Sequence, residues 1–152
     1  SGVTAETFEF VGWLLNKGVN VSKIYKQVLE RKTRANFELR KLALNRLEFF
    51  EEGKIAFTYI TKEDEEKVNA ENGDHEGIVE EGRCIEGVEV SVFIHQTEKG
   101  LKISMRSNEY VNVSDVCLLM GGGGHIRAAG CLLQGSIEQA KEKILRQLKS
   151  VI

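Results

Sequence analysis

The first 50 residues place apolar side chains three and four positions apart, which is the spacing of one helical face. Thr4 has the residue type of an N-cap for a helix that ends near Gly18, and either Asn20 or Ser22 can begin a second helix. A third helix is predicted from about residue 33 to residue 50, with an apolar stripe formed by Leu39, Ala43, Leu47 and Phe50. Residues 1–50 are therefore predicted to be helical.

After Lys54 the pattern changes to short apolar strands that alternate with helices. Thr61 and Asp64 have the spacing of a capping box, which predicts a helix that ends before Asn72-Gly73, and Ser136 begins an amphipathic helix near the C-terminus. Strands are predicted at 55–60, 78–79, 88–94 and 101–105, with a hairpin turn at 98–100. The sequence thus predicts an α/β domain over residues 51–152, with a mixed β-sheet flanked by helices.

Composition and charge narrow the function classes. With 152 residues, of which 41% are hydrophobic, the chain can bury one sizeable core. No apolar run is long enough to span a bilayer and no signal-peptide pattern is present, so we expect a cytoplasmic protein without a membrane partner. The middle of the chain is acidic, because residues 51–98 hold 14 Asp and Glu against 4 Lys and Arg. Proteins that bind long duplexes carry a broad basic face, so this distribution favours a short ligand in a confined pocket.

The three cysteines, Cys84, Cys117 and Cys131, are widely spaced and form no Cys-x-x-Cys pair. An odd number without such a pair indicates reduced thiols, two of them buried. We therefore expect the cysteines to serve neither as metal ligands nor as nucleophiles.

Residues 121–130 read Gly-Gly-Gly-Gly-His-Ile-Arg-Ala-Ala-Gly and combine high backbone freedom with small side chains. Apolar residues before this glycine block predict a strand end and a short helix capped by Asn112 or Ser114. After the four glycines, residues 125–129 are predicted to form one helical turn that ends at Gly130, and residues 131–133 a strand. Such a loop directs backbone N–H groups toward an anion such as phosphate; a flexible hinge is the alternative.

The motif Gly-Gly-Gly-His-x-x-Ala-Ala-Gly resembles the signature of the DHHA1 domain, which follows the DHH domain in a group of metal-dependent phosphoesterases. Residues 101–107, Leu-Lys-Ile-Ser-Met-Arg-Ser, resemble the strand that precedes the glycine loop in that family. Residues 75–79 and 85–88 are similar to the Glu-Gly-(Ile/Leu)-Val and Ile-x-Gly-Val steps of its oligoribonuclease and pAp-phosphatase branch. That branch usually has Thr where this chain has His75. The resemblance implies a DHHA1-like fold and a substrate-binding role for residues 51–152. It also implies that residues 1–50 are the helical connector from a DHH domain that this chain lacks.

The glycine block and the resemblance together indicate a set of substrate-binding residues. Arg106 is expected to hold a phosphate through two parallel hydrogen bonds, or else to form a surface ion pair with a neighbour such as Glu109. His125 either contacts phosphate or a scissile-bond oxygen, with a general-acid role left open, or caps the turn. The full set is Arg106, Ser107, Gly121, Gly122, Gly123, Gly124, His125, Ala128, Ala129 and Gly130.

The two other histidines are assigned less directly. His95 falls on the strand face opposite Val92 and Ile94, so we expect it to be exposed to solvent. His75, beside Glu76, either lines the site or belongs to a turn. The acidic run Glu63 to Glu66 is interpreted as a solvated helix face rather than a metal site.

In the resembling family, two divalent ions, usually manganese, are held by the DHH domain and carry out hydrolysis. This chain contains no Asp-His-His triplet, and Asp74-His75 is its one adjacent Asp-His pair. The resemblance therefore implies that the chain itself binds no metal or other cofactor, lacks the catalytic DHH domain and is inactive alone. The implied partners are that DHH domain and a short single-stranded oligonucleotide, pAp or a dinucleotide; an oligomer is compatible with the sequence.

A second family carries the same glycine signature. It occurs in the C-terminal region of alanyl-tRNA synthetases, where it belongs to an RNA-binding or dimerisation module. The acidic middle of the chain and the Glu-Gly-Ile-Val step favour the phosphoesterase. Binding to folded RNA with steep salt dependence would favour the synthetase-type module.

Overall fold

The computed structural model describes residues 3–152; Ser1 and Gly2 lie outside the described residues. The chain divides into two units, one up to Thr33 and one from Arg34 to Ile152. Residues 34–50 belong to the second unit, because Leu39 and Ala43 are buried in its core. Among the described residues no helix is long and apolar enough to cross a membrane.

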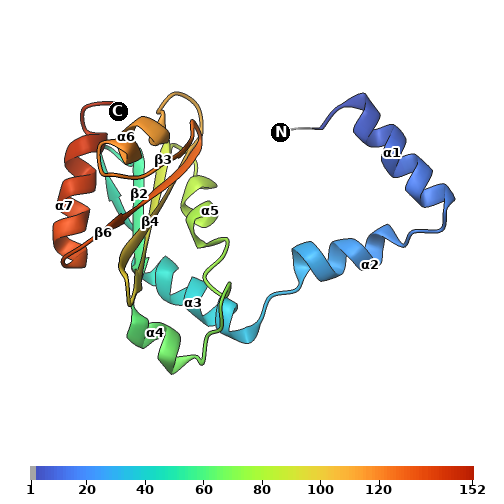
Figure 1. Ribbon diagram of the computed structural model, residues 1–152, viewed down its shortest axis with the longest axis horizontal. Coiled ribbons are helices and arrows are strands. Elements are labelled where there is room, and N and C mark those ends of the chain that lie inside the picture. Colours follow the sequence, from blue (N-terminus) through green and yellow to red (C-terminus); the bar gives the residue numbers. More distant parts are fainter. Residues whose placement is uncertain (1–2) are drawn as a thin grey trace. The chain divides into compact units, whose positions relative to one another are not determined.

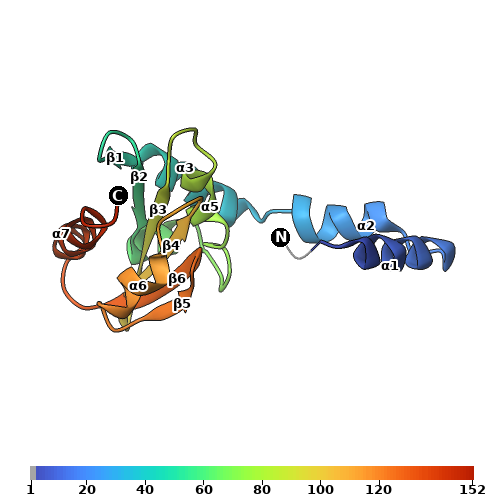
Figure 2. The same ribbon diagram turned by 90° about the horizontal axis from the view of Figure 1, so that it is seen from above.

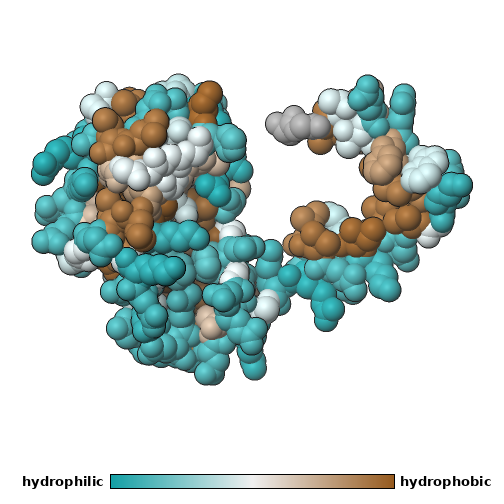
Figure 3. Space-filling view, viewed as in Figure 1, coloured by the Kyte–Doolittle hydropathy of each residue, from teal (hydrophilic) through white to brown (hydrophobic). Residues whose placement is uncertain are grey.

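The unit up to Thr33 is helical, as predicted. It contains α1 (Ala5–Asn16), α2 (Val21–Tyr25) and the π-helical turn η1 (Lys26–Glu30). Thr4 forms a capping box with Thr7 at the start of α1, and the Asn20 side chain accepts a hydrogen bond from Lys23 N. None of these helices has a buried residue, and Figure 3 shows their apolar side chains as brown surface. The large exposed ones are Val3, Phe8, Phe10, Val11, Trp13, Leu15, Val21, Ile24, Tyr25, Val28 and Leu29.

The second unit is an α/β domain built on a mixed sheet, which confirms the predicted fold class (Figure 1). Six strands lie in the order β1-β2-β3-β4-β6-β5; β2 and β3 are parallel and the other pairs antiparallel. The elements are α3 (Arg34–Asn45), β1 (Glu48–Phe50), β2 (Ile55–Ile60), α4 (Lys62–Lys67), α5 (Ile78–Arg83), β3 (Val90–Thr97), β4 (Gly100–Ser107), α6 (Val113–Leu118), β5 (Gly123–His125), β6 (Ala128–Leu133) and α7 (Ile137–Leu148).

Helices cover the two faces of the sheet unequally (Figure 2). On one face, α6 and α7 pack against the sheet, and their apolar residues join those of the strands in the main core. On the other face, α3 and α5 pack over β2 and β3 in a smaller core around Leu39, Ile78 and Phe93. The side chains of β4 and β6 on this second face, such as Lys102 and Leu132, are exposed or half-buried. This face is therefore open over β4, β6 and β5.

Two predicted elements are wrong in the first half of the domain. The third helix ends at Asn45 rather than Phe50, because residues 48–50 form the edge strand β1 and the chain then reverses at Glu51 to Gly53, all with positive φ. The strand predicted at 78–79 is the start of α5, which follows Gly77 in a left-handed conformation (φ 82°). Two adjacent apolar residues fit a strand or a buried helix equally well, so periodicity did not separate them.

The glycine block also folds differently from the prediction. The helical turn expected over residues 125–129 is absent: β5 (Gly123–His125) and β6 (Ala128–Leu133) form an antiparallel hairpin. The short helix before the block is present as α6, capped by Asn112, whose side chain accepts from Ser114 N. The glycines therefore do not open a helix, and the anion-binding argument from a helix N-terminus does not apply here.

Candidate functional site

The open face of β4 carries three polar side chains in alternate positions, Lys102, Ser104 and Arg106. Their neighbours in the sequence, Leu101, Ile103 and Met105, point into the main core. Successive side chains of a strand point to opposite faces, so the three polar residues share one face. They line two adjoining hollows of about 430 and 540 Å³, which we call together the β4 groove.

Strands β6 and β5 supply a floor of small residues on one side of the β4 groove. Gly130 lies opposite Ser104 and Ala128 opposite Arg106 in the β4–β6 register. On the next strand, Gly123 lies opposite Gly130 and His125 opposite Ala128. Residues opposite one another in an antiparallel pair point to the same face, so His125 joins the row of Arg106 and Ala128 across the sheet. His125 is exposed, and Gly123 lines the groove.

The other wall of the β4 groove is acidic and comes from α5 and the loop before it. Its lining includes His75, Glu76, Gly77 and Glu80. Arg106 Nε donates to Glu80 Oε1 at 3.1 Å, and Arg106 Nη1 donates to Met105 O at 3.1 Å. These two contacts use two of the five guanidinium N–H groups. Arg106 therefore forms an ion pair with Glu80. The sequence had suggested Glu109 as an example of such a partner.

The side chains of two predicted site residues, Ser107 and Ala129, lie on the core side of the sheet, although Ala129 still borders the β4 groove. Ser107 is 2% exposed and its hydroxyl donates to Val111 O at 2.6 Å, so it holds the loop after β4. Ala129 lies opposite Met105 and is part of the main core. Both follow directly in sequence after a residue of the open face, so the alternation of the strand turns them inward.

The glycines of the block have distinct roles. A Cβ on Gly122 would lie 2.2 Å from Gly130 O, on Gly124 2.6 Å from Ala128 O, and on Gly130 2.6 Å from Ile103 O. These three glycines thus permit close backbone packing within the sheet. Gly121 has space around it but a φ of 82° in the turn after α6. Gly123 has no positive φ, and a Cβ added to it would meet only Leu118 Cδ2, at 3.8 Å, so it alone in the block accepts a side chain without strain.

Sequence reasoning missed several residues of the site. Lys102 and Ser104 alternate with apolar residues, and this pattern shows that they share one face of the strand. It does not show which face of the sheet the helices leave uncovered. Glu80 was missed because residues 78–79 were assigned to a strand. The expected exposure of His95 is wrong: it is 8% exposed beneath α4 and the loop that follows.

Among the described residues, Glu65, His75 and His95 form a cluster whose side chains could together hold a metal ion. His75 lines the β4 groove, and its ring centroid lies 4.2 Å from that of His95. Burial, followed by the neighbouring His95, lowers the pKa of His75, which favours its neutral form. Asp74, the other member of the Asp-His pair, accepts a hydrogen bond from Glu71 N at 2.8 Å in a turn.

Known proteins resemble this chain over nearly its whole length. A bifunctional oligoribonuclease and PAP phosphatase, NrnA, from Thermus thermophilus is 29% identical over 150 residues, which cover 98% of this chain and 44% of the relative. An exopolyphosphatase-related protein from Bacteroides fragilis superposes with a TM-score of 0.90 at 26% identity and covers 97% of this chain. A pGpG-specific phosphodiesterase, PggH, from Vibrio cholerae superposes with a TM-score of 0.61 at 12% identity, which shows a shared fold.

This chain spans less than half of the length of the NrnA relative and of the Bacteroides protein, 44% of each. The matched part includes the sheet, the β4 groove and the β5–β6 hairpin. A family model for the DHHA1 domain matches residues 52–152, so the chain belongs to the DHHA1 domain family.

Proposed function

We propose that the β4 groove binds the phosphate-bearing end of a short nucleotide ligand: a single-stranded oligonucleotide, pAp or a linear dinucleotide. The observation that carries this proposal is the placement of Lys102 and Arg106 on one open face of β4, beside the floor of Ala128 and Gly130. A guanidinium donates two parallel hydrogen bonds to phosphate, and an ammonium adds a compact positive charge. The small floor residues leave space for a nucleoside against the sheet.

The acidic wall of the β4 groove supports a short ligand rather than a long one. Glu76 and Glu80 lie on the α5 side, opposite the floor of small residues. A continuous polyanion would be repelled by these carboxylates, whereas one terminal phosphate can pair with Arg106 and Lys102. This arrangement favours recognition of the terminal phosphate of a ligand over recognition of a continuous sugar-phosphate backbone.

The proposed role is that of the substrate-binding part of a metal-dependent phosphodiesterase. Support comes from membership of the DHHA1 family and from the 29% identity to NrnA. We assign hydrolysis to two divalent ions, such as manganese, in a DHH domain outside this chain, where they would activate water and stabilise the developing charge. The 152-residue chain is then expected to bind ligand without hydrolysing it.

The helices before Thr33 fit the proposed connection to that DHH domain. Their exposed apolar side chains, among them Phe8, Trp13 and Leu29, have no buried counterpart in their own unit. Contiguous apolar surface of this kind marks a protein–protein contact. We assign the DHH domain of the same protein as the partner of this surface.

Calorimetric titration of the chain with pAp and with oligonucleotides of two to five residues tests the proposal. Arg106→Ala is expected to weaken binding by about 1.5–3 kcal/mol, the value of a charge-assisted hydrogen bond, or about 10- to 150-fold in Kd. Arg146→Ala is the matched control, because it removes the same charge from an exposed position on α7, on the other face of the sheet.

Equal affinities of the wild type and Arg106→Ala would reject the assignment of the β4 groove. Tight binding to folded RNA with steep salt dependence, and none to short oligonucleotides, would instead support the module found in alanyl-tRNA synthetases.

A further inference from the structure

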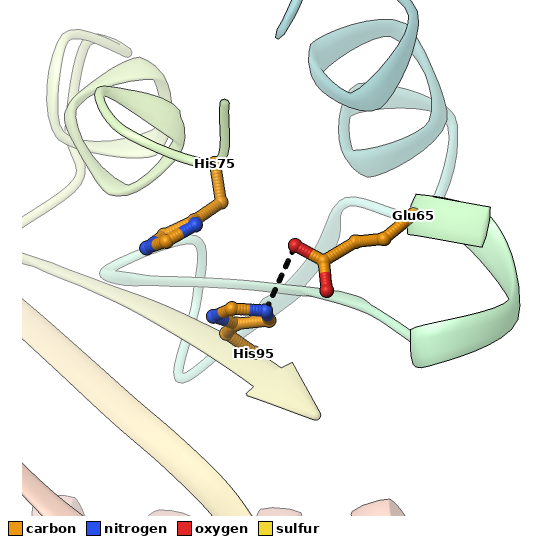
Figure 4. Close-up of side chains that lie close together, drawn as sticks. All are labelled: Glu65, His75 and His95. Carbon is orange, nitrogen blue, oxygen red and sulfur yellow. Dashed lines mark ion pairs between the residues drawn. The ribbon is translucent and has the colours of Figure 1, made fainter. Parts of the chain in front are cut away.

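We infer that Glu65, His75 and His95 form a binding site for one divalent transition-metal ion of the zinc type. The three residues come from separate elements: Glu65 from α4, His75 from the loop between α4 and α5, and His95 from β3. Figure 4 shows their side chains converging on one point, with the carboxylate of Glu65 facing the ring of His95.

The distances are close to those of a coordinated ion. One potential ligand atom from each residue lies within 4.8 Å of the other two, and His95 Nε2 lies 3.0 Å from Glu65 Oε1. Zinc bonds to nitrogen and oxygen are about 2.0–2.2 Å long, so tetrahedral donors lie about 3.3 Å apart. A separation of 4.8 Å would have to shorten by about 1.5 Å, which side-chain torsions supply without a change in the backbone.

Three imidazole nitrogens of the cluster are buried and lack a hydrogen-bond partner among the described residues. His75 Nδ1 and His95 Nδ1 are buried and have no hydrogen-bond partner among residues 3–152. His95 Nε2 contacts Glu65 without the alignment of a hydrogen bond. A buried polar atom without a partner costs about 1–3 kcal/mol, so such atoms are rare unless a water or an ion satisfies them. A bound cation would occupy a nitrogen of each ring.

The donor set selects the type of ion. Two imidazoles and one carboxylate suit zinc and its neighbours in the transition series, whereas magnesium and calcium prefer oxygen ligands alone. Three protein ligands leave a fourth position for water, on the side of a small cavity that Glu71 and Glu98 also line. The nearby ammonium groups of Lys62 and Lys102 oppose a cation, and the carboxylates of the cavity offset them.

The ion would connect three segments of the domain. It would attach α4 and the loop over residues 68–77 to the end of β3. That loop leads into α5 and contributes His75 to the wall of the β4 groove. Metal binding is therefore expected to order this wall and to raise the thermal stability of the domain.

Zinc titration of the metal-free chain tests the site. The chain, without a histidine tag, is stripped with a chelator and titrated with Zn²⁺ against a chromophoric competitor. We expect one equivalent to bind and the Tm to rise until that equivalent is reached. Co²⁺ in place of Zn²⁺ is expected to give the visible absorption of a tetrahedral ion. Mg²⁺ in excess is expected not to displace either ion.

Variants identify the ligands. His75→Gln, His95→Gln and Glu65→Gln are each expected to weaken zinc binding by more than about tenfold and to remove the rise in Tm, because each removes one metal ligand. His125→Gln, which changes an exposed histidine elsewhere, is expected to retain both properties. Cys84→Ser, which removes the exposed thiol, is also expected to bind zinc like the wild type.

His75→Gln is the decisive variant if His95→Gln fails to fold, because His75 is only half-buried. The inference is overturned if the wild type binds no zinc, or if His75→Gln binds it as tightly as the wild type. Loss of zinc binding together with intact nucleotide binding would separate this site from the function proposed for the β4 groove.

Discussion

The buried carboxylate of Asp64 should make the stability of the domain depend on pH in a calculable way. Asp64 is 3% exposed at the start of α4, and both of its oxygens accept hydrogen bonds from the guanidinium of Arg46. It also accepts from Thr61 N at 2.8 Å and Thr61 Oγ1 at 3.0 Å. The hydrogen bond from Arg46, followed by those from Thr61, lowers the pKa of Asp64 from 3.8 to about 2.

The sign follows from linkage. The folded pKa lies below the unfolded one, so the carboxylate stabilises the fold fully above the unfolded value and progressively less as the pH falls through the folded value. A difference of nearly two pKa units corresponds to about 2.4 kcal/mol of unfolding free energy at neutral pH. Of this, about 1.3 kcal/mol remains at about pH 3.

Urea unfolding of the wild type and Asp64→Asn at about pH 7 and about pH 3 measures this contribution. The difference in unfolding free energy between the two proteins should fall by about 1 kcal/mol between these pH values, since other carboxylates titrate in both proteins and cancel. The pH dependence of the difference should largely disappear in the Arg46→Ala background. A difference that does not change with pH would refute the assignment of Arg46 as its main cause.

Two further predictions concern backbone contacts within the domain. Gly124→Ala should lower the unfolding free energy by at least about 2 kcal/mol, because the added Cβ would meet Ala128 O at 2.6 Å and the backbone φ is 150°. Gly123→Ala is the control and should change the unfolding free energy by less than about 1 kcal/mol. Equal effects of the two substitutions in urea unfolding would contradict this reasoning. Glu89→Gln should lower the unfolding free energy by about 2–4 kcal/mol, because the carboxylate of Glu89 accepts hydrogen bonds from three consecutive amides. These are Glu109 N, Tyr110 N and Val111 N, at 2.7–2.9 Å. Unchanged hydrogen exchange at these amides in the variant would show that the carboxylate does not hold the loop.

Local signals in the sequence predicted the elements that are fixed locally. The helices beginning after Thr4, Thr61 and Ser136 are each capped by the side chain that the sequence suggested, and each cap involves residues three positions apart. The hairpin turn before Gly100 is likewise present. Such features depend on a few consecutive residues, so one sequence is sufficient to predict them.

Elements fixed by distant contacts were not predicted. Ile78 and Val79 form a helix because they pack on Phe93 and Ile60 across the sheet, which a pair of apolar residues does not reveal. The family resemblance suggested Arg106 as a site residue. It did not suggest Lys102, whose place on the open face depends on which part of the sheet the helices leave uncovered. The cluster around His95 joins residues from α4, a loop and β3 that lie far apart in the sequence, and no spacing rule connects them.

The packing of Gly122, Gly124 and Gly130 against neighbouring backbone has a consequence for how relatives of this chain are recognised. A search that requires these glycines selects proteins in which the β5–β6 hairpin folds back tightly, whatever they bind. Differences in ligand preference among such proteins should therefore be sought at positions outside the signature, beginning with those that correspond to Lys102 and Ser104. Two sequences with the same glycines and different residues there share an architecture and need not share a substrate.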